Sequence, residues 1–213
     1  MITDHWPLYG LRLRTPRLEL RLPDPADLSA LADAAAAGVH DPAIQPFTTP
    51  WTDTDPATRA RNVLTWHWRL LSRWSPEDWT LPLVTVAQGT VIGTQDVGGR
   101  SFARLREVRT GSWLGTAYQG RGYGTEMRAA ILHLAFHGLG AEFARSEAFE
   151  DNPASYRVSR KLGYADDGTE RYVVRDRVKV GRRLLLDRAS WAAARTVPVE
   201  IEGLAACLPM FGL

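Results

Sequence analysis

The sequence predicts a single domain of mixed α/β class. Its 213 residues suit one ordinary domain, which buries about 70% of the surface that its unfolded chain exposes. Segments of helical periodicity are interspersed with β-rich segments, and no repeat or low-complexity linker divides the chain. A glycine-rich turn also joins one expected strand to the strongest expected helix. We therefore expect one domain over residues 1–213, with a core at about 11–190 and a C-terminal extension at 191–213.

The chain opens with an expected strand and helix. Leucines alternate in part between residues 11 and 22, and Thr15-Pro16 interrupts them, which predicts a broken strand. Asp24-Pro25 provides a helix N-cap and a proline at the first helical position, and Gly38 ends the alanine-rich run that follows.

A long loop and a second helix come next. Residues 40–51 hold three prolines and no periodicity, and loops of that length in compact domains are often functional. The second helix begins at Asp55-Pro56 and extends to about residue 74. Its expected apolar face consists of Ala60, Val63, Leu64, Trp68 and Leu71.

The middle of the chain predicts strands and one strong helix. Residues 81–87 and 90–97 are β-rich and flank Gln88-Gly89, a plausible hairpin turn, and 107–114 is a further strand. Residues 124–137 form the helix, because Met127, Ala130, Ile131, Leu134 and Ala135 recur at helical spacing.

The last third predicts shorter elements. Residues 143–149 alternate as a strand, 153–162 form a short helix and 180–187 form another strand. Val197, Val199 and Ile201 alternate in the extension, so this segment is expected to add an edge strand or to contribute to a dimer contact.

Composition narrows the class of protein. No segment approaches the roughly 20 apolar residues of a membrane span, and the N-terminus does not resemble a secretory signal, so a cytoplasmic protein is expected. The single Cys207 excludes an intrachain disulfide. A net charge of +2 gives little support for nucleic-acid binding. His133 and His137 are four residues apart but have no evident third ligand, so no metal site is expected.

The densest motif runs from Leu114 to Glu126 and places three glycines between a strand and a helix. Glycines let the backbone approach a ligand closely, and N–H groups at a helix N-terminus attract anions such as a pyrophosphate. The spacing Gly120-x-Gly122-x-Gly124 differs from that of a dinucleotide-binding fingerprint, and no P-loop lysine follows. A tight turn without a ligand is the alternative interpretation.

Three motifs in order resemble the GNAT N-acyltransferases, and in particular their RimJ/RimL-like branch. Gln119-Gly120-Arg121-Gly122-Tyr123-Gly124 resembles the acyl-coenzyme A loop Q/R-x-x-G-x-G/A of that family. The segment from Asn152 to Tyr164 resembles the N-x-x-S…K-L-G-F/Y block, and residues 13–18 are typical of the branch opening. Shorter similarities near residues 5–8, 38–42 and 50–52 are typical of an actinobacterial subgroup with succinyl-coenzyme A binders.

This resemblance implies a mostly antiparallel sheet that splays open between its fourth and fifth strands, here residues 107–114 and 143–149. Acetyl- or succinyl-coenzyme A is the implied co-substrate and would lie in the split. Backbone N–H groups of residues 119–124 would carry most of the binding. The implied coenzyme A site comprises Leu114, Gln119, Gly120, Arg121, Gly122, Tyr123, Gly124, Thr125, Asn152 and Ser155.

The implied reaction is direct attack of a neutral amine on a thioester, which needs a route for a proton and a partner for the departing thiolate. Many family members place a tyrosine acid where this chain has Ser159. The branch instead tends to use the serine three residues after the asparagine, here Ser155, to hydrogen-bond the sulfur. Helix capping is the alternative role for Asn152 and Ser155.

The candidate base is Glu107, near the position where the family's fourth strand carries a glutamate. Its spacing from the glycine loop is about one residue off, so a bulge would have to correct it. A surface glutamate is the alternative, and Glu147, Asp96 or a chain of waters are reserves.

The chain is therefore expected to be an enzyme that transfers an acyl group from acyl-coenzyme A to a protein N-terminus, a lysine or a small amine. Family members are often dimers, so a homodimer is expected, without nucleic-acid or membrane partners. A non-catalytic acyl-coenzyme A sensor is the alternative. The tryptophans at 51, 66, 68, 74, 79 and 113 flank the region that should cover the acceptor. Nearby arginines could pair with a carboxylated acyl chain, although the sequence assigns none.

Overall fold

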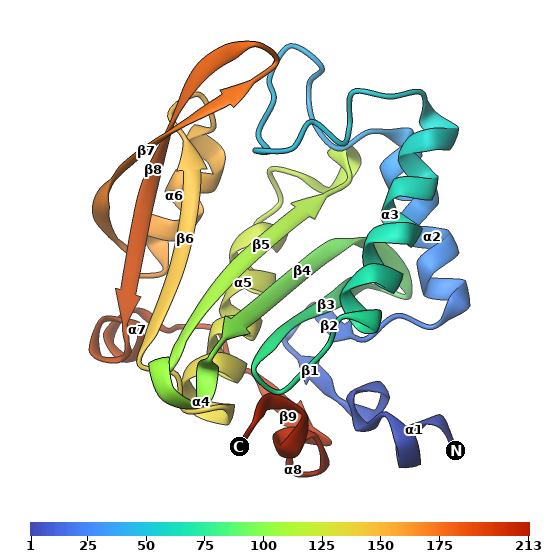
Figure 1. The fold of residues 1–213 in the computed structure, drawn as a ribbon, viewed down its shortest axis with the longest axis vertical. Helices are drawn as coiled ribbons and strands as arrows, with labels where there is room; N and C mark the ends of the chain where they lie inside the picture. The colour runs from blue at the N-terminus through green and yellow to red at the C-terminus, as the bar shows by residue number, and fades with distance from the viewer.

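A computed structural model describes all 213 residues. Its centre is one nine-stranded sheet in the order β7-β8-β6-β5-β4-β3-β2-β1-β9 (Figure 1). All neighbouring strands are antiparallel except β5 and β6, so the predicted mixed α/β class with a mostly antiparallel sheet is confirmed. The strands are β1 (Arg12–Arg14), β2 (Leu18–Arg21), β3 (Asp78–Ala87), β4 (Thr90–Arg100), β5 (Glu107–Leu114), β6 (Phe143–Phe149), β7 (Ala165–Val174), β8 (Arg177–Asp187) and β9 (Glu200–Glu202).

Helices cover both faces of the sheet. In Figure 1, α2 and α3 lie together on one side, and α5 lies behind the strands. The helices are α1 (Ile2–His5), α2 (Pro25–Ala37), α3 (Pro56–Ser72), α4 (Phe102–Leu105), α5 (Tyr123–His133), α6 (Pro153–Lys161), α7 (Arg188–Ala194) and α8 (Leu204–Cys207). Three 3-10 helices are η1 (Pro7–Gly10), η2 (Thr116–Tyr118) and η4 (Leu208–Phe211), and the π-helix η3 (Leu134–Gly138) follows α5 directly. No helix is both long and apolar enough to cross a membrane.

Alternation along the central strands produces a core on each face. On β3, Leu81 and Leu83 join the larger core, which packs against α5, whereas Val84 and Val86 join the smaller core beneath α2 and α3. Successive side chains of a strand point to opposite faces, so one strand with apolar residues at nearly every position serves both cores.

The parallel strands β5 and β6 pair over only three residues each. Their register joins residues 107–109 to residues 143–145, after which no bridge connects them. β5 continues beside β4, and β6 continues beside β8, so the sheet divides beyond Arg109 and Arg145. Both strands have the predicted bounds, and the predicted split between them is present.

Helices α2 and α3 begin as predicted. Asp24 and Asp55 are N-caps whose carboxylates accept hydrogen bonds from the backbone three residues later, and a proline follows each. The predicted face of α3 is only partly correct. Val63 is buried, but Trp68 is 55% exposed. His67 is buried in place of Trp68, and its Nδ1 forms a hydrogen bond with the Val63 carbonyl.

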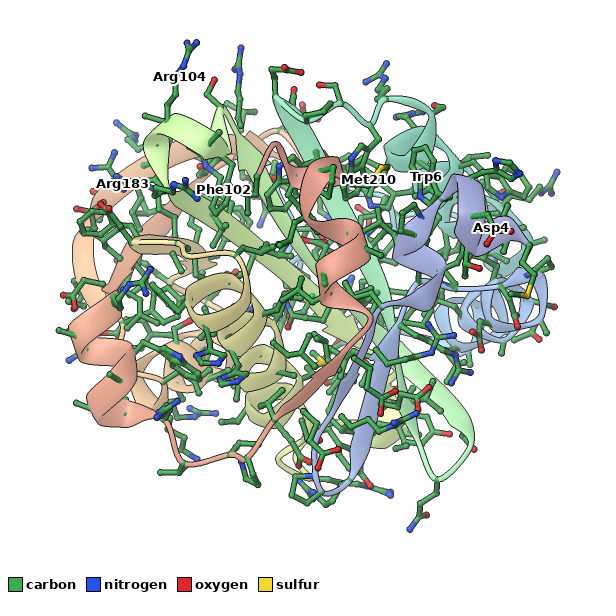
Figure 2. All side chains as sticks on the ribbon, turned by 90° about the horizontal axis from the view of Figure 1, so that it is seen from below. Asp4, Trp6, Phe102, Arg104, Arg183 and Met210 are labelled. Atoms are coloured by element: carbon green, nitrogen blue, oxygen red, sulfur yellow. The ribbon has the colours of Figure 1, made fainter.

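The C-terminal segment returns to the sheet and the N-terminus. β9 pairs with β1 and supplies an edge strand, shorter than the alternating segment indicated. Beyond it, α8 and η4 cross the underside of the molecule, where Met210 lies near Trp6 (Figure 2). The Trp74 indole donates to the Met210 carbonyl, and Trp6 packs edge-on against Trp74.

Candidate active site

The glycine loop enters α5 through two left-handed backbone positions. Gly120 has φ of 74° and Gly122, the N-cap of α5, has φ of 82°. These conformations are strained for residues with a Cβ, so glycine is required at both. Gly124 has an ordinary φ, and an added Cβ there would meet its nearest atoms at 3.9 Å.

This geometry leaves a row of backbone donors without protein acceptors. Thr125 and Glu126 donate their N–H groups to the Gly122 carbonyl, but the N–H groups of residues 120–124 make no hydrogen bond within the chain. They lie at the positive end of the α5 dipole, where anions are stabilised. The loop therefore offers five consecutive donors suited to a pyrophosphate.

Gln119 fixes the start of this loop. Its side-chain amide donates to the carbonyls of Val39, at 2.6 Å, and Leu114, at 2.8 Å. Leu114 itself ends β5 and is 8% exposed. The predicted residues Leu114 and Gln119 therefore hold the loop between β5 and the segment after α2.

Glu126 fixes the other end, a role that the sequence did not reveal. Its carboxylate is 6% exposed, accepts from the Thr15 hydroxyl at 2.7 Å and forms an ion pair with Arg17 at 2.6 Å. Arg17 also donates to the Arg121 carbonyl and lies over the Tyr123 ring at 4.7 Å. The β1–β2 turn thus anchors the loop, and the signal in the sequence was an acidic residue beside a mostly apolar run.

The second motif forms α6, where Asn152 is the N-cap. Its Oδ1 accepts the Ser155 N–H at 3.2 Å, which is the capping role given as the alternative. Ser155 is partly exposed, whereas Ser159, one turn later, is fully buried. Val158 reaches to within 3.9 Å of a Cβ placed on Gly124, so α6 lies against the beginning of α5. α6, which carries Ser155, therefore adjoins the end of the loop, while Ser159 has no access to solvent.

The structure does not bring Glu107 to the loop. Glu107 begins β5 at the paired end of the split, about 23 Å from Leu114 at roughly 3.3 Å per residue. Its carboxylate forms an ion pair with Arg145 at 2.8 Å. No bulge near Glu107 shifts it toward the loop, because the β5–β6 register over residues 107–109 and the β4–β5 register over residues 109–114 are both continuous.

Of the two reserve carboxylates, Asp96 has the better position. It pairs with Gly111 across β4 and β5, just beyond the last β5–β6 bridge, and its Oδ1 lies 2.8 Å from a Cβ placed on Gly111. Burial raises the pKa of Asp96 to about 6, although the Gly111 backbone and the Arg128 charge oppose this shift. Glu147 accepts a hydrogen bond from the Tyr172 hydroxyl at 2.7 Å. Burial is the main cause that raises the pKa of Tyr172, and the hydrogen bond to Glu147 raises it further.

The tryptophans divide into separate groups. Trp51 packs against Trp113 of β5, with ring centroids 5.8 Å apart, and against Phe47 at 5.3 Å. Trp74 and Trp79 stack at the other end of the molecule beside Phe211. Trp66 and Trp68 are about half exposed on α3. Only the Trp51–Trp113 pair adjoins the open end of the split.

The β7–β8 hairpin meets the loop at residues 39–55 above that open end (Figure 1). Arg175, at the hairpin tip, forms an ion pair with Asp53 and donates to the Pro42 carbonyl. Lys179 donates to the Gln45 carbonyl at 2.6 Å and pairs with Asp151 at 2.8 Å. The hairpin and the loop thus form a bridge over the split.

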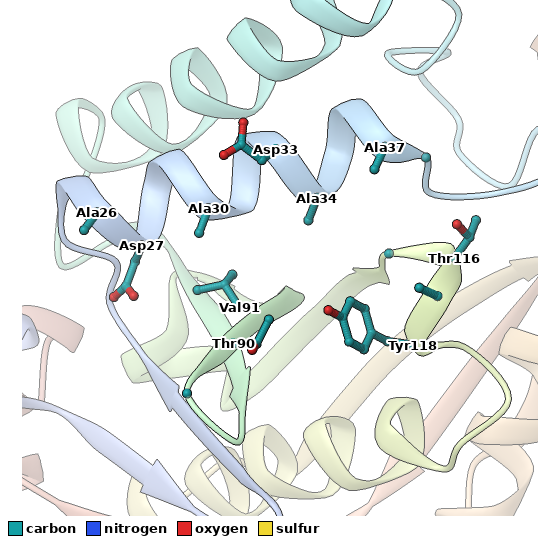
Figure 3. A pocket seen from close by; sticks show the side chains of 14 residues that line it. Ala26, Asp27, Ala30, Asp33, Ala34, Ala37, Thr90, Val91, Thr116 and Tyr118 are labelled. Carbon is teal, nitrogen blue, oxygen red and sulfur yellow. The ribbon is translucent and has the colours of Figure 1, made fainter.

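A pocket of about 610 Å³ lies outside the split, between α2 and the β3–β4 turn (Figure 3). Ala30, Ala34 and Ala37 of α2 point into it from one side, and Tyr118 faces them. None of the predicted site residues lines this pocket. His, Cys, Asp and Glu side chains nowhere gather in threes in a way that could hold a metal ion.

Comparison with known proteins identifies the family. Residues 17–165 match the family model of the acetyltransferase (GNAT) domain. The chain belongs to the GNAT acetyltransferase family. The match covers the glycine loop, both strands of the split and α6, and it confirms the resemblance to the GNAT family that the sequence motifs indicated. An acyl transfer to an amine is the general chemistry of GNAT enzymes.

Solved structures share the fold at low sequence identity. RimJ from Mycobacterium smegmatis, in complex with a coenzyme A disulfide, has a TM-score of 0.69 and 16% identity over 94% of each chain. RimL, a ribosomal L7/L12 α-N-protein acetyltransferase in complex with coenzyme A, has a TM-score of 0.65 and 17% identity over 83% of this chain and 97% of its own. A GCN5-related N-acetyltransferase from Brucella melitensis has a TM-score of 0.66 and 23% identity over 86% of this chain and 81% of its own.

Proposed function

We propose that this GNAT protein transfers an acyl group, acetyl or succinyl, from acyl-coenzyme A to a primary amine by direct attack in a ternary complex. The observation that carries the proposal is the row of five free N–H groups at residues 120–124, placed beside a sheet that divides at β5 and β6. These donors suit the pyrophosphate, and the split offers a path for the pantetheine and the thioester.

In this proposal the amine nitrogen attacks the thioester carbonyl, a C–N bond forms and the C–S bond breaks. Asp96 accepts the proton that the attacking nitrogen loses, because its raised pKa of about 6 suits a base near neutral pH. Ser155 hydrogen-bonds the departing sulfur. Glu107 is the weaker candidate base, since its ion pair with Arg145 lies at the paired end of the strands.

The acceptor would enter from the face that carries Asp96 and Trp113, under the bridge formed by the β7–β8 hairpin. RimL acts on a protein N-terminus, so an N-terminal peptide is one acceptor to test. A lysine peptide and small amines such as polyamines are the others. A homodimer remains a prediction of the family resemblance.

A non-catalytic acyl-coenzyme A sensor is the second candidate. It is favoured by the position of two predicted catalytic side chains, since Ser159 is fully buried and Glu107 is held in an ion pair.

Calorimetric titration with free coenzyme A, acetyl-coenzyme A and succinyl-coenzyme A tests the proposed function. We expect micromolar binding, followed by release of free thiol when the amine panel is added. Failure of all three ligands to bind would refute both candidates. Binding without turnover on any amine would favour the sensor. Full turnover by the single variant Asp96→Asn would refute the role given to Asp96, and full turnover by Ser155→Ala would refute the role given to Ser155.

A further inference from the structure

A buried polar cluster lies between α5 and the two strands of the split. Arg128 of α5 is 5% exposed and occupies its centre. Its Nη1 donates to the Ser146 hydroxyl of β6 at 3.1 Å and to the Ser159 hydroxyl of α6 at 3.5 Å. Its Nη2 donates to the Ser112 hydroxyl of β5 at 3.1 Å. We call these four residues the Arg128 cluster.

The Arg128 cluster contains donors without acceptors. No carboxylate forms an ion pair with Arg128, and its buried Nε has no hydrogen-bond partner. Each serine oxygen accepts from the guanidinium, so each hydroxyl proton is left to donate elsewhere, and none finds an acceptor within the chain. The neighbouring Tyr164 hydroxyl is also buried, and it lies near Thr110 and Arg128 without forming a hydrogen bond of good geometry. The Asp96 carboxylate interacts electrostatically with Arg128 but forms no ion pair with it, so the guanidinium has no directly bonded anion. An acceptor-only anion would supply one.

The cluster lies where the strands divide. The last β5–β6 bridge joins Arg109 to Arg145, and Ser146 is the next residue on β6. Ser112 lies three residues beyond Arg109 on the other strand. Because the guanidinium is almost fully buried, an anion reaches it only as the end of a longer molecule that enters through the split.

We infer that the Arg128 cluster binds the terminal carboxylate of the acyl chain, so that the preferred donor is the coenzyme A thioester of a short dicarboxylic acid. This inference rests on the proposed function, in which the thioester occupies the split and the acyl chain extends toward its apex. A carboxylate is planar and accepts hydrogen bonds only, which matches both the guanidinium and the free hydroxyl protons. A simple acetyl group would leave these donors without acceptors.

Two acyl-coenzyme A thioesters whose acyl chains have the same number of carbon atoms test the inference on the wild-type protein. Succinyl-coenzyme A ends in a carboxylate and butyryl-coenzyme A ends in a methyl group. We expect calorimetry to show at least about tenfold tighter binding of the succinyl thioester, as expected for charged hydrogen bonds to a desolvated site. Arg128→Met should remove this preference and leave the affinity for free coenzyme A within about twofold, because the loop donors are unchanged.

Arg157→Met is the matched control, because it removes an exposed positive charge from α6 without touching the cluster. It should keep the succinyl preference. Equal affinity of the wild-type protein for the two thioesters would overturn the inference, and so would an Arg128→Met variant that weakens both thioesters equally. If that variant does not fold, the wild-type comparison decides alone, and Ser112→Ala should reduce the preference in part. Binding of free coenzyme A separates the two proposals. If the wild-type protein does not bind free coenzyme A, the proposed function is refuted. If it binds free coenzyme A but shows no preference between the two thioesters, only this inference is refuted.

Discussion

At the residue scale, Asp96 combines a position beside the split with a raised pKa. It lies beside Gly111 at the beginning of the split, and burial raises its pKa to about 6. A carboxylate with this pKa is mostly charged at neutral pH and still accepts a proton readily. Glu107 lacks this position, because it lies at the paired end of the strands and forms an ion pair with Arg145.

We therefore expect Asp96→Asn to lower kcat/KM by about a hundredfold or more. With a weakly basic acceptor amine, whose own titration lies at lower pH, the wild-type kcat/KM should rise through about pH 6, and the variant should lack this rise. Asp78→Asn, which changes an exposed carboxylate at the far end of β3, should retain the wild-type profile. A variant with the full wild-type rise through pH 6 would exclude Asp96 as the base.

The same substitution has a consequence for stability. The folded-state pKa of Asp96 lies above its ordinary value of 3.8, so the free energy of unfolding falls as the pH rises from about 4 to about 6. Above pH 6 the whole penalty remains, and it amounts to at most about 3 kcal/mol. Asp96→Asn should therefore raise the melting temperature at pH 7 and have little effect at pH 4.

The sequence was least able to predict which individual side chains are buried. Arg128 occurs in a run of apolar residues, but nothing in the sequence indicated that every face of α5 over residues 126–132 is buried. Trp68 was expected in the core of α3 and His67 was not, because helical spacing does not distinguish two adjacent apolar faces. Both errors arise from burial, which depends on neighbouring elements that local periodicity does not describe.

At the element scale, the strands and the loop of the site were the most predictable parts. β5 and β6 have the expected bounds because glycine or turn residues follow both segments, in which apolar and polar residues are interspersed. β7 was missed, since the segment Ala165–Val174 is mostly exposed, rich in charged residues and shows no alternation. A strand at the edge of a sheet has little need of apolar side chains, so its sequence resembles a loop.

The glycine loop gives a second prediction, because its glycines have different backbone requirements. Gly122→Ala forces a residue with a Cβ into the left-handed region, which should cost about 1–2 kcal/mol and displace the free N–H groups. We expect its affinity for coenzyme A to fall by about tenfold or more. Gly124→Ala is the control, since its φ is ordinary and its Cβ finds space; its affinity should stay within about threefold.

Calorimetry with coenzyme A and thermal denaturation check both variants. Equal effects at the two positions would show that loss of glycine flexibility, rather than the left-handed conformation, is what matters in this loop.

At the scale of the whole molecule, segments distant in the sequence meet around the split. The β1–β2 turn holds the loop through Glu126, the segment after α2 holds it through Gln119, and the β7–β8 hairpin reaches the loop at residues 39–55. Motifs far apart in the chain therefore meet at one candidate site. This assembly could be predicted only through the family resemblance, because local patterns do not specify contacts over such separations.

The bridge over the split gives the third prediction. Arg175 and Asp53 link the hairpin to the loop, and breaking this ion pair should loosen the cover over the acceptor without changing the donor loop. We expect Asp53→Asn to raise the KM of the acceptor amine by about threefold or more while the Kd of coenzyme A stays unchanged. The melting temperature should change little, because partly exposed ion pairs contribute only about 0–1 kcal/mol.

Salt provides the decisive readout, because it screens an exposed ion pair. The acceptor KM of the wild-type protein should rise between about 50 mM and 500 mM salt toward that of Asp53→Asn, and the variant should respond less. Arg177→Gln, at an exposed position two residues beyond Arg175, is the matched control and should behave as the wild type does. An unchanged acceptor KM in Asp53→Asn would show that the bridge does not shape the acceptor site, and a parallel loss of coenzyme A affinity would show that it instead supports the whole split.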